Sequence, residues 1–283
     1  MIFETTAGVA LETETFGEDQ ADSPLLLVSG AGSPMQFWPD DICHALGAEG
    51  RKVVRYCHRD TGLSDHFDRP YSVDPLLEDL VSVIDGLAGG RAHLAGHSMG
   101  GYLSLLAAAR MPAKVASVAA ISCGPTTDPD RYDQFAMSAV SPETWAVLMR
   151  NEPSGDFDKD LPGWMASWEF LNGERAFDHK MARGYTRSLY RGDARNAQVA
   201  DNHIHAMTTL PGNFPETLAA LEMPVTIFHG TDDPLVPFDN GRALSRVVPG
   251  ARLDPLEGAG HMFFDPAVWH EMKCAISHSL MDL

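Results

Sequence analysis

The sequence predicts an α/β protein whose mostly parallel central sheet is covered by helices on both faces. Continuous apolar runs at residues 24–28, 52–57, 115–122 and 224–230 are typical of parallel strands that are buried on both faces. Stretches of helical periodicity lie between several of these runs, so strands and helices alternate along the chain. At 283 residues the chain can bury a large core, and an α/β fold of this length often forms a single unit.

The N-terminal elements can be assigned in chain order. Residues 2–16 alternate apolar and polar side chains around Ala7-Gly8, which predicts a β-hairpin. The buried strand at 24–28 ends in Ser29-Gly30-Ala31-Gly32-Ser33, and we expect a helix at about 36–49. The next strand, 52–57, leads into a polar loop at 58–64.

The following elements continue the alternation. Ser72 or Asp74 can cap a helix that has Pro75 at its first position, and apolar residues recur with a helical period up to Leu87. We then expect, in order, a strand at 92–95, a helix at 101–109, strands at 115–122, 224–230 and 251–256, and a helix at about 266–280.

The stretch from residue 125 to residue 220 differs from its surroundings. It lacks apolar strand runs, is rich in Met, Trp and Phe, and is interrupted by Pro, Gly and Asp. We interpret residues 125–220 as a helical cap inserted into the sheet domain, which leaves residues 1–124 as the first part of that domain and residues 221–283 as the second.

Composition excludes several classes of function. The 39 acidic and 21 basic residues give a formal net charge of −18, which argues against binding to nucleic acid or to an anionic membrane. Cys43, Cys57, Cys123 and Cys274 lie far apart, as expected of reduced thiols in the cytoplasm. We expect no signal peptide, and no apolar run approaches the ~18 residues of a membrane-spanning helix.

Gly96-His97-Ser98-Met99-Gly100 has the Gly-x-Ser-x-Gly pattern of a nucleophilic serine. It lies between a predicted strand and a predicted helix, where this motif forms a sharp turn that exposes the serine hydroxyl. The two glycines remove Cβ atoms that would collide in such a turn. A chance glycine–serine turn is the alternative, but the flanking elements favour Ser98 as a catalytic residue.

A serine nucleophile also needs a base and an acid that orients the base. Asp233 follows a buried strand, and we prefer it to its neighbour Asp232 because Pro234 makes the turn directly after it rigid. His261 lies late in the chain, after a strand and within the glycine-rich Gly258-Ala259-Gly260, and a neutral imidazole can take the serine proton. The order Ser, Asp, His matches the order used by hydrolases of this architecture.

The backbone N–H groups of Met99 and Ala31 are the expected oxyanion donors. Gly30-x-Gly32 after a strand also permits a dinucleotide-binding reading. That reading fails because Met35 occupies the third glycine position and the next strand ends without the ribose-binding acid.

We expect substrate contacts from seven further residues: Gly30, His97, Trp38, Met137, Trp145, Trp168 and Met262. For those in 125–220, a role in the hydrophobic core of the cap is an equally good interpretation. His203 and His205 have no partners at metal-ligand spacing, so we expect neither a metal site nor a cofactor.

Together these motifs resemble the α/β-hydrolase superfamily, and within it the chain looks closest to aclacinomycin methylesterase-like hydrolases. The sequence Arg55-Tyr56-Cys57-His58-Arg59-Asp60-Thr61-Gly62-Leu63-Ser64 is similar to that group's Arg-Tyr-Asp-His-Arg-Asp-Thr-Gly-x-Ser, and Phe37-Trp38-Pro39 to its x-Trp-Pro. Cys57 replaces the usual Asp, which shapes the loop, so the catalytic interpretation is unaffected. The resemblance implies cleavage of a methyl ester on a polyketide-like ring system.

The leading expectation is therefore a serine hydrolase that cleaves a small-molecule ester or lactone through an acyl-enzyme. Whether it forms a homodimer stays open. A carbon–carbon bond hydrolase of the meta-cleavage type would share these residues, as would a hydrolase-fold receptor with little turnover. A serine at position 98 argues against dehalogenase and epoxide hydrolase chemistry, which the resemblance ties to a carboxylate nucleophile.

Overall fold

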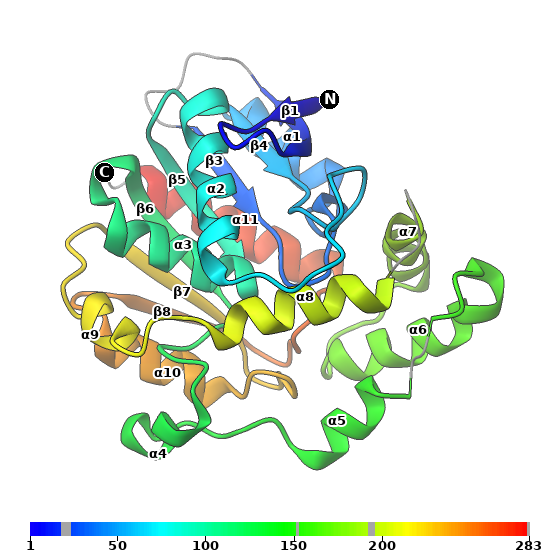
Figure 1. Cartoon of the computed structure of the whole chain (residues 1–283). Helices are drawn as coiled ribbons and strands as arrows, with labels where there is room; N and C mark the ends of the chain where they lie inside the picture. The colour runs from blue at the N-terminus through cyan, green and yellow to red at the C-terminus, as the bar shows by residue number, and fades with distance from the viewer. Residues whose placement is uncertain (18–23, 151–152, 192–195, 282–283) are drawn as a thin grey trace.

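The computed structural model describes residues 1–17, 24–150, 153–191 and 196–281. Within these residues, eight strands form one sheet (Figure 1). Across the sheet they are β1 (Ile2–Glu4), β2 (Ala10–Phe16), β4 (Val53–Tyr56), β3 (Leu25–Val28), β5 (Ala92–His97), β6 (Val115–Ile121), β7 (Val225–Gly230) and β8 (Arg252–Leu256). The pairs β1–β2 and β2–β4 are antiparallel and all other neighbours are parallel. The predicted hairpin and the mostly parallel sheet are confirmed.

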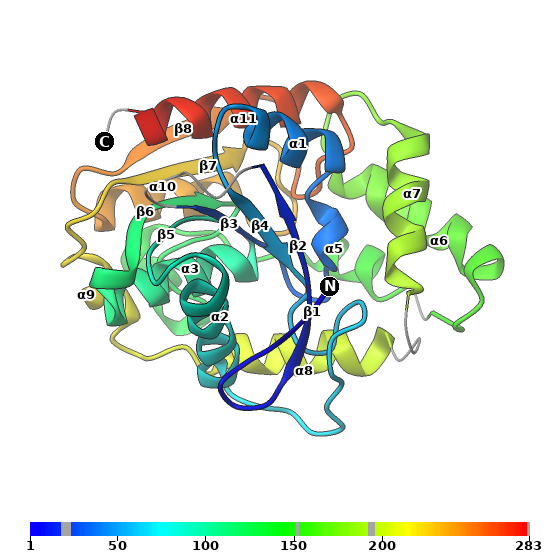
Figure 2. The same ribbon diagram turned by 90° about the horizontal axis from the view of Figure 1, so that it is seen from above.

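Two apolar cores, one on each face, explain the continuous apolar runs. In β3, Leu26 and Val28 belong to a cluster with α2 (Val73–Leu87) and α3 (Met99–Arg110). Leu25 and Leu27 instead join a cluster with α1 (Asp40–Ala48) and α11 (Pro266–Met281). Figure 2 shows α1 and α11 on one side of the sheet and α2 and α3 on the other. A central strand needs apolar residues at every position because both faces are covered.

The predicted helix at 36–49 is wrong in its first part. The structure has a short 3-10 helix, η1 (Met35–Phe37), and α1 begins only at Asp40. Trp38 is extended, with φ −85° and ψ 108°, because a residue before proline is disfavoured in the helical region. Of the two candidate caps before the next helix, the structure has Ser72 at the N-cap position, so α2 begins at Val73 and Pro75 is its third residue and not its first. Pro75 is tolerated there because the first helical N–H groups have no intrahelical acceptor.

The segment between β6 and β7 is built from helices in the residues that the structure describes. It contains η3 (Pro129–Arg131), α4 (Tyr132–Phe135), α5 (Pro142–Leu148), α6 (Phe157–Leu171), α7 (His179–Leu189), α8 (Asn196–Thr208) and α9 (Phe214–Leu218). Outside this segment, the 3-10 helix η2 (Pro112–Lys114) precedes β6, and helix α10 (Phe238–Val247) connects β7 to β8. The helical content agrees with the expected insertion, while the domain boundaries at 124/125 and 220/221 stay a prediction. Among the described helices, none combines the length and the apolar character needed to cross a bilayer.

Candidate active site

Ser98 occupies the turn between β5 and α3 with a strained backbone. Its φ is 53° and its ψ is −119°, a conformation that costs a non-glycine residue ~1–3 kcal/mol. The Ser98 N–H donates to Ile121 O at 2.8 Å, and α3 begins at the next residue, earlier than the expected 101. A Cβ on Gly96 would lie 2.1 Å from Gly100 O, and one on Gly100 would lie 2.2 Å from Val28 O. Both motif glycines are therefore required by close backbone contacts.

Two N–H groups near this turn have the surroundings expected of oxyanion donors. Met99 is the first residue of α3, where the helix carries a partial positive charge. Ala31 lies in the loop after β3, which lines the same cavity as Ser98. In the described part of the chain, neither N–H donates to a protein acceptor.

Asp233 and His261 meet in the loops after β7 and β8. His261 Nδ1 donates to Asp233 Oδ2 at 2.8 Å, and the Asp233 side chain is fully buried. The other oxygen, Oδ1, accepts from the N–H groups of Leu235 at 2.9 Å and Val236 at 2.8 Å. Burial alone would raise the pKa of Asp233, but His261, followed by His229 and the Val236 N–H, holds it below its ordinary value. The Asp232 side chain is exposed and, among the described residues, accepts a hydrogen bond from Thr231 Oγ1 alone, so it is Asp233 that the structure pairs with His261.

Two further histidines surround this pair, and sequence reasoning assigned a role to only one of them. His97 Nε2 donates to the backbone carbonyl of His261 at 2.9 Å, which helps to place the imidazole loop. Burial, followed by the proximity of His261, holds the pKa of His97 well below its ordinary value. His229 lies on β7, with Nε2 3.7 Å from Asp233 Oδ2, and it donates to Val236 O at 2.7 Å. Its strand position gave no sign of this contact.

The end of α6 fixes the loop that carries His261. Gly260 N–H donates to Asn172 O at 2.9 Å, and Met262 N–H donates to Leu171 O at 2.9 Å. A Cβ on Gly260 would lie 2.1 Å from Leu171 O, so this contact requires glycine. The helices between β6 and β7 therefore take part in positioning the imidazole.

Ser98 and His261 line one cavity of about 270 Å³. Among the described residues no hydrogen bond joins their side chains. Contacts of this kind are often long in ligand-free enzymes and tighten when substrate binds.

Most of the residues expected around the substrate line this cavity, but three do not. Gly30, Ala31, His97, Trp168 and Met262 lie in its wall. Trp38 is in the core, 1% exposed, with its ring 5.7 Å from that of Trp269. Met137 is buried beside Gly124, and Trp145 lies on the surface of α5 with 47% exposure. The structure thus places these three residues outside the wall of this cavity, because the direction of a side chain depends on tertiary packing that residue type does not reveal.

Other wall residues went unrecognised in the sequence. They are Gly32, Ser33, Leu148, Trp164, Leu171, Tyr185, Leu189 and Leu235. Trp164 stacks on Trp168 with ring centroids 4.9 Å apart and an angle of 15° between the planes. This i, i+4 pair of tryptophans was the one sequence signal that could have identified Trp164.

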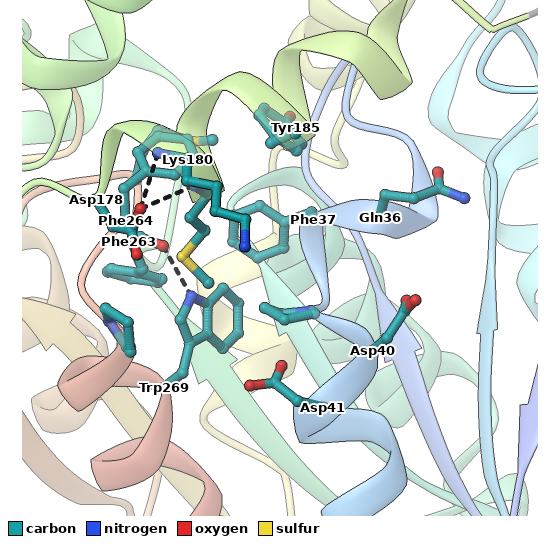
Figure 3. Close-up of a pocket in the computed structure, with 15 residues that line it drawn as sticks. Gln36, Phe37, Asp40, Asp41, Asp178, Lys180, Tyr185, Phe263, Phe264 and Trp269 are labelled. Atoms are coloured by element: carbon teal, nitrogen blue, oxygen red, sulfur yellow. Dashed lines mark hydrogen bonds between the residues drawn. The ribbon is translucent and has the colours of Figure 1, made fainter.

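The structure has a second cavity of about 430 Å³ (Figure 3). Tyr185 and Met262 line both cavities. Figure 3 shows Phe37, Phe263 and Trp269 on its wall and Asp40 and Asp41 beside them.

Cys57 is buried in the loop region where the resemblance places an Asp. Its Sγ donates to Glu12 Oε2 at 3.4 Å and accepts from Met35 N–H at 3.3 Å. Burial raises the pKa of Cys57 to about 12, so the thiol is protonated and unreactive at neutral pH. Its contacts agree with a loop-shaping role. No three His, Cys, Asp or Glu residues of the described chain are grouped as metal ligands, and the expectation of a metal-free and cofactor-free site stays a prediction.

Comparison with known proteins identifies the class of protein. The model of the alpha/beta hydrolase family matches residues 25–271, and the chain belongs to this family. This confirms the resemblance found in the sequence.

Several curated relatives are similar to this chain over most of its length. Rhodomycin D methylesterase DauP from Streptomyces sp. (strain C5) is 31% identical, over 94% of this chain and 93% of the relative. Rhodomycin D methylesterase DnrP from Streptomyces peucetius is 30% identical, over 96% and 94%. The putative carbamate hydrolase RutD from Pseudomonas savastanoi pv. phaseolicola (strain 1448A / Race 6) is 29% identical, over 85% and 88%.

Solved structures share the fold at lower identity. A hydrolase from Pseudomonas aeruginosa PA01 superposes with a TM-score of 0.75 at 24% identity, covering 99% of this chain and 97% of that one. The meta-cleavage product hydrolase CumD from Pseudomonas fluorescens IP01 also gives 0.75, at 17% identity, covering 99% and 95%. At these identities the likeness concerns the fold alone.

Proposed function

We propose that the protein is a serine hydrolase that cleaves a carboxylic ester with Ser98, His261 and Asp233. The observation that carries the proposal is the buried Asp233–His261 hydrogen bond of 2.8 Å beside a cavity that also contains the strained Ser98. A nucleophile, a base and an acid that orients the base define this reaction class.

The mechanism assigns each group one task. Ser98 Oγ attacks the ester carbonyl while His261 takes its proton, and the N–H groups of Met99 and Ala31 stabilise the oxyanion. His261 then gives the proton to the leaving alcohol, which leaves an acyl-enzyme. Water, deprotonated by His261, attacks that acyl group, and His261 then returns the proton to Ser98 Oγ as the bond to the acyl group breaks and the carboxylic acid is released. Asp233 keeps the imidazole in the required tautomer and stabilises its charged form.

For the substrate we propose a methyl ester on a bulky apolar ring system. The curated relatives with 31% and 30% identity are rhodomycin D methylesterases. The cavity wall is largely aromatic and aliphatic, with Trp164, Trp168 and Tyr185 next to leucines. At about 270 Å³ it suits the ester end of a substrate, because sites that enclose a whole drug-sized molecule measure ~300–1,000 Å³. The rest of a large ring system would extend beyond it.

The test compares hydrolysis of a short-chain nitrophenyl ester by the wild type and by Ser98→Ala. We expect the variant to fold and to lose at least ~10³-fold in kcat. Ser245→Ala, on the surface of α10, is the matched control and should behave like the wild type. Activity close to that of the wild type in Ser98→Ala would refute the assignment.

A substrate panel then distinguishes the reaction classes. It contains polycyclic methyl esters, lactones, carbamates and vinylogous diketones, with Ser98→Ala as the blank. Preference for methyl esters supports the proposal. Preference for carbamates would indicate a carbamate hydrolase, and preference for vinylogous diketones would indicate a carbon–carbon bond hydrolase. Covalent labelling of Ser98 without turnover of any substrate would favour a ligand receptor.

A further inference from the structure

The loop after β3, residues 29–34, carries the Ala31 N–H and is held from three sides; we call it the oxyanion loop. His58 Nε2 donates to Ser29 O at 2.9 Å, and Ser33 Oγ bonds to the Tyr185 hydroxyl at 2.9 Å. The third contact comes from α8, where Gly32 N–H donates to His203 Nδ1 at 2.9 Å. It lies one residue from the proposed oxyanion donor.

Gly32 lies in a turn that is closed by a hydrogen bond from Ser33 N–H to Gly30 O at 3.2 Å. Its φ is +65°, in the left-handed region, and a Cβ placed on it would meet no atom within 4 Å. Glycine adopts this and other backbone conformations at little cost. The hydrogen bond to His203 is the contact that the Gly32 N–H itself makes, and it acts with the turn hydrogen bond to fix the direction of that group.

The chemistry of this contact fixes the state of the His203 ring. A backbone N–H can only donate, so Nδ1 must be an unprotonated acceptor and the proton must reside on Nε2. Nε2 donates to Arg59 O at 3.0 Å, and the side chain of His203 is completely buried. Both ring nitrogens are thus satisfied by backbone groups of two different loops. Burial lowers the pKa of His203 to about 4, so that this neutral tautomer persists well below pH 7.

Arg59, whose carbonyl accepts the hydrogen bond from His203 Nε2, is itself held in place. Arg59 makes two hydrogen bonds to Asp79 of α2, at 2.7 and 2.8 Å, and Asp79 is 1% exposed. Helix α8 runs across the lower part of the molecule from the side of α9 to the side of α7 (Figure 1). A helix of the segment between β6 and β7 therefore ties the oxyanion loop to the α2 side of the sheet domain.

We propose that His203 is a positioning residue that aims the Ala31 N–H at the oxyanion by accepting the hydrogen bond from Gly32. This inference rests on the proposed serine-hydrolase function. It assigns a task to a histidine whose sequence surroundings suggest only a structural polar residue. Because the oxyanion exists only in the transition state, the effect belongs to kcat and not to KM.

Two substitutions separate the two hydrogen bonds of His203. In His203→Asn the amide oxygen lies near the position of Nδ1 and can accept from Gly32, while the donor to Arg59 is lost. In His203→Gln the amide nitrogen can reach the position of Nε2 and donate to Arg59 O, while the acceptor for Gly32 is lost. A merely structural role predicts similar kinetic effects for both variants.

We expect kcat of His203→Asn to stay within ~3-fold of the wild type and kcat of His203→Gln to fall by ~10–10³-fold, with KM changed less than ~3-fold in both. Thermal unfolding should show lower stability for both variants. Equal losses of kcat in the two variants, or an unchanged kcat in His203→Gln, would overturn the proposal.

Two measurements remain informative if the proposed function fails or if a variant does not fold. Hydrogen exchange should show faster exchange of residues 29–34 in His203→Gln than in His203→Asn. A histidine-selective ¹⁵N spectrum of the wild type should show His203 with Nδ1 unprotonated and Nε2 protonated from pH 8 to about pH 5. Equal exchange in the variants, or a His203 that titrates near pH 6.5, would contradict the role of His203 without reference to activity. The serine-hydrolase function is tested separately, by the activity of the wild type and of Ser98→Ala.

Discussion

The adjacent carboxylates of Asp232 and Asp233 differ in burial, although both lie in the same loop and both were candidates for the catalytic acid. Asp233 is buried against His261, and Asp232 faces solvent. In Asp233→Asn the new amide group would donate to His261 Nδ1 and hold the imidazole in the wrong tautomer. We expect kcat to fall by ~10⁴-fold while the melting temperature changes little.

The neighbouring substitution is the control for this prediction. Asp232→Asn removes the same charge one residue away and leaves the imidazole contact intact, so steady-state hydrolysis should match the wild type. A larger loss of hydrolysis rate in Asp232→Asn than in Asp233→Asn would instead indicate that Asp232 is the acid that orients His261.

At the scale of elements, the strand-to-helix turn and helix α7 give the same substitution opposite effects. A methyl group on Gly100 would lie 2.2 Å from Val28 O, so Gly100→Ala should destabilise the fold by ~1–3 kcal/mol or more. Gly184 is exposed within α7 and has no atom within 4 Å of an added Cβ. Gly184→Ala should therefore stabilise the protein by ~0.5–1 kcal/mol.

Urea unfolding of both variants measures these changes directly. The account requires opposite signs relative to the wild type. A Gly100→Ala protein as stable as the wild type would mean that the turn can relax without the close contact of α3 with β3.

Elements were predictable from the sequence where a local pattern determines them, and boundaries were not. Apolar runs identified β3, β4, β6 and β7, since each is buried on both faces. The break before α1 depended on Pro39 and was missed because the surrounding residues otherwise suit a helix. The motif around Ser98 was recognisable because close packing demands its glycines.

Contacts between distant parts of the chain were beyond local patterns. His203 meets Gly32 and Arg59, which lie 171 and 144 residues away. Tyr185 reaches the site from α7 in the same way. Trp38 was expected at the site from its place in a family motif and Trp145 from its residue type, and packing places the first in the core and the second on the surface.

Across the whole molecule, buried neutral histidines make stability depend on pH. Burial lowers the pKa of His58 to about 3 and those of His93 and His203 to about 4. The unfolded chain binds these protons near pH 6.5, whereas the folded chain resists them. Their stabilising effect is therefore complete above about pH 6.5 and is lost as the pH falls toward 4.

His93 offers a test of this dependence away from the site. It lies in β5 five residues before Ser98 and bonds to Ser117 Oγ at 2.8 Å. His93→Gln cannot take up this proton, so its melting temperature should fall less steeply between pH 6.5 and pH 4 than that of the wild type. Parallel curves for the two proteins would show that His93 does not contribute.

Locating a covalent fluorophosphonate adduct by peptide mass spectrometry tests the central claim most directly. The wild type should carry one adduct, on Ser98, and Asp233→Asn should acquire it far more slowly because its imidazole is in the wrong tautomer. An adduct on another residue, or rapid ester turnover with Ser98 unmodified, would contradict the assignment of Ser98 as the attacking group.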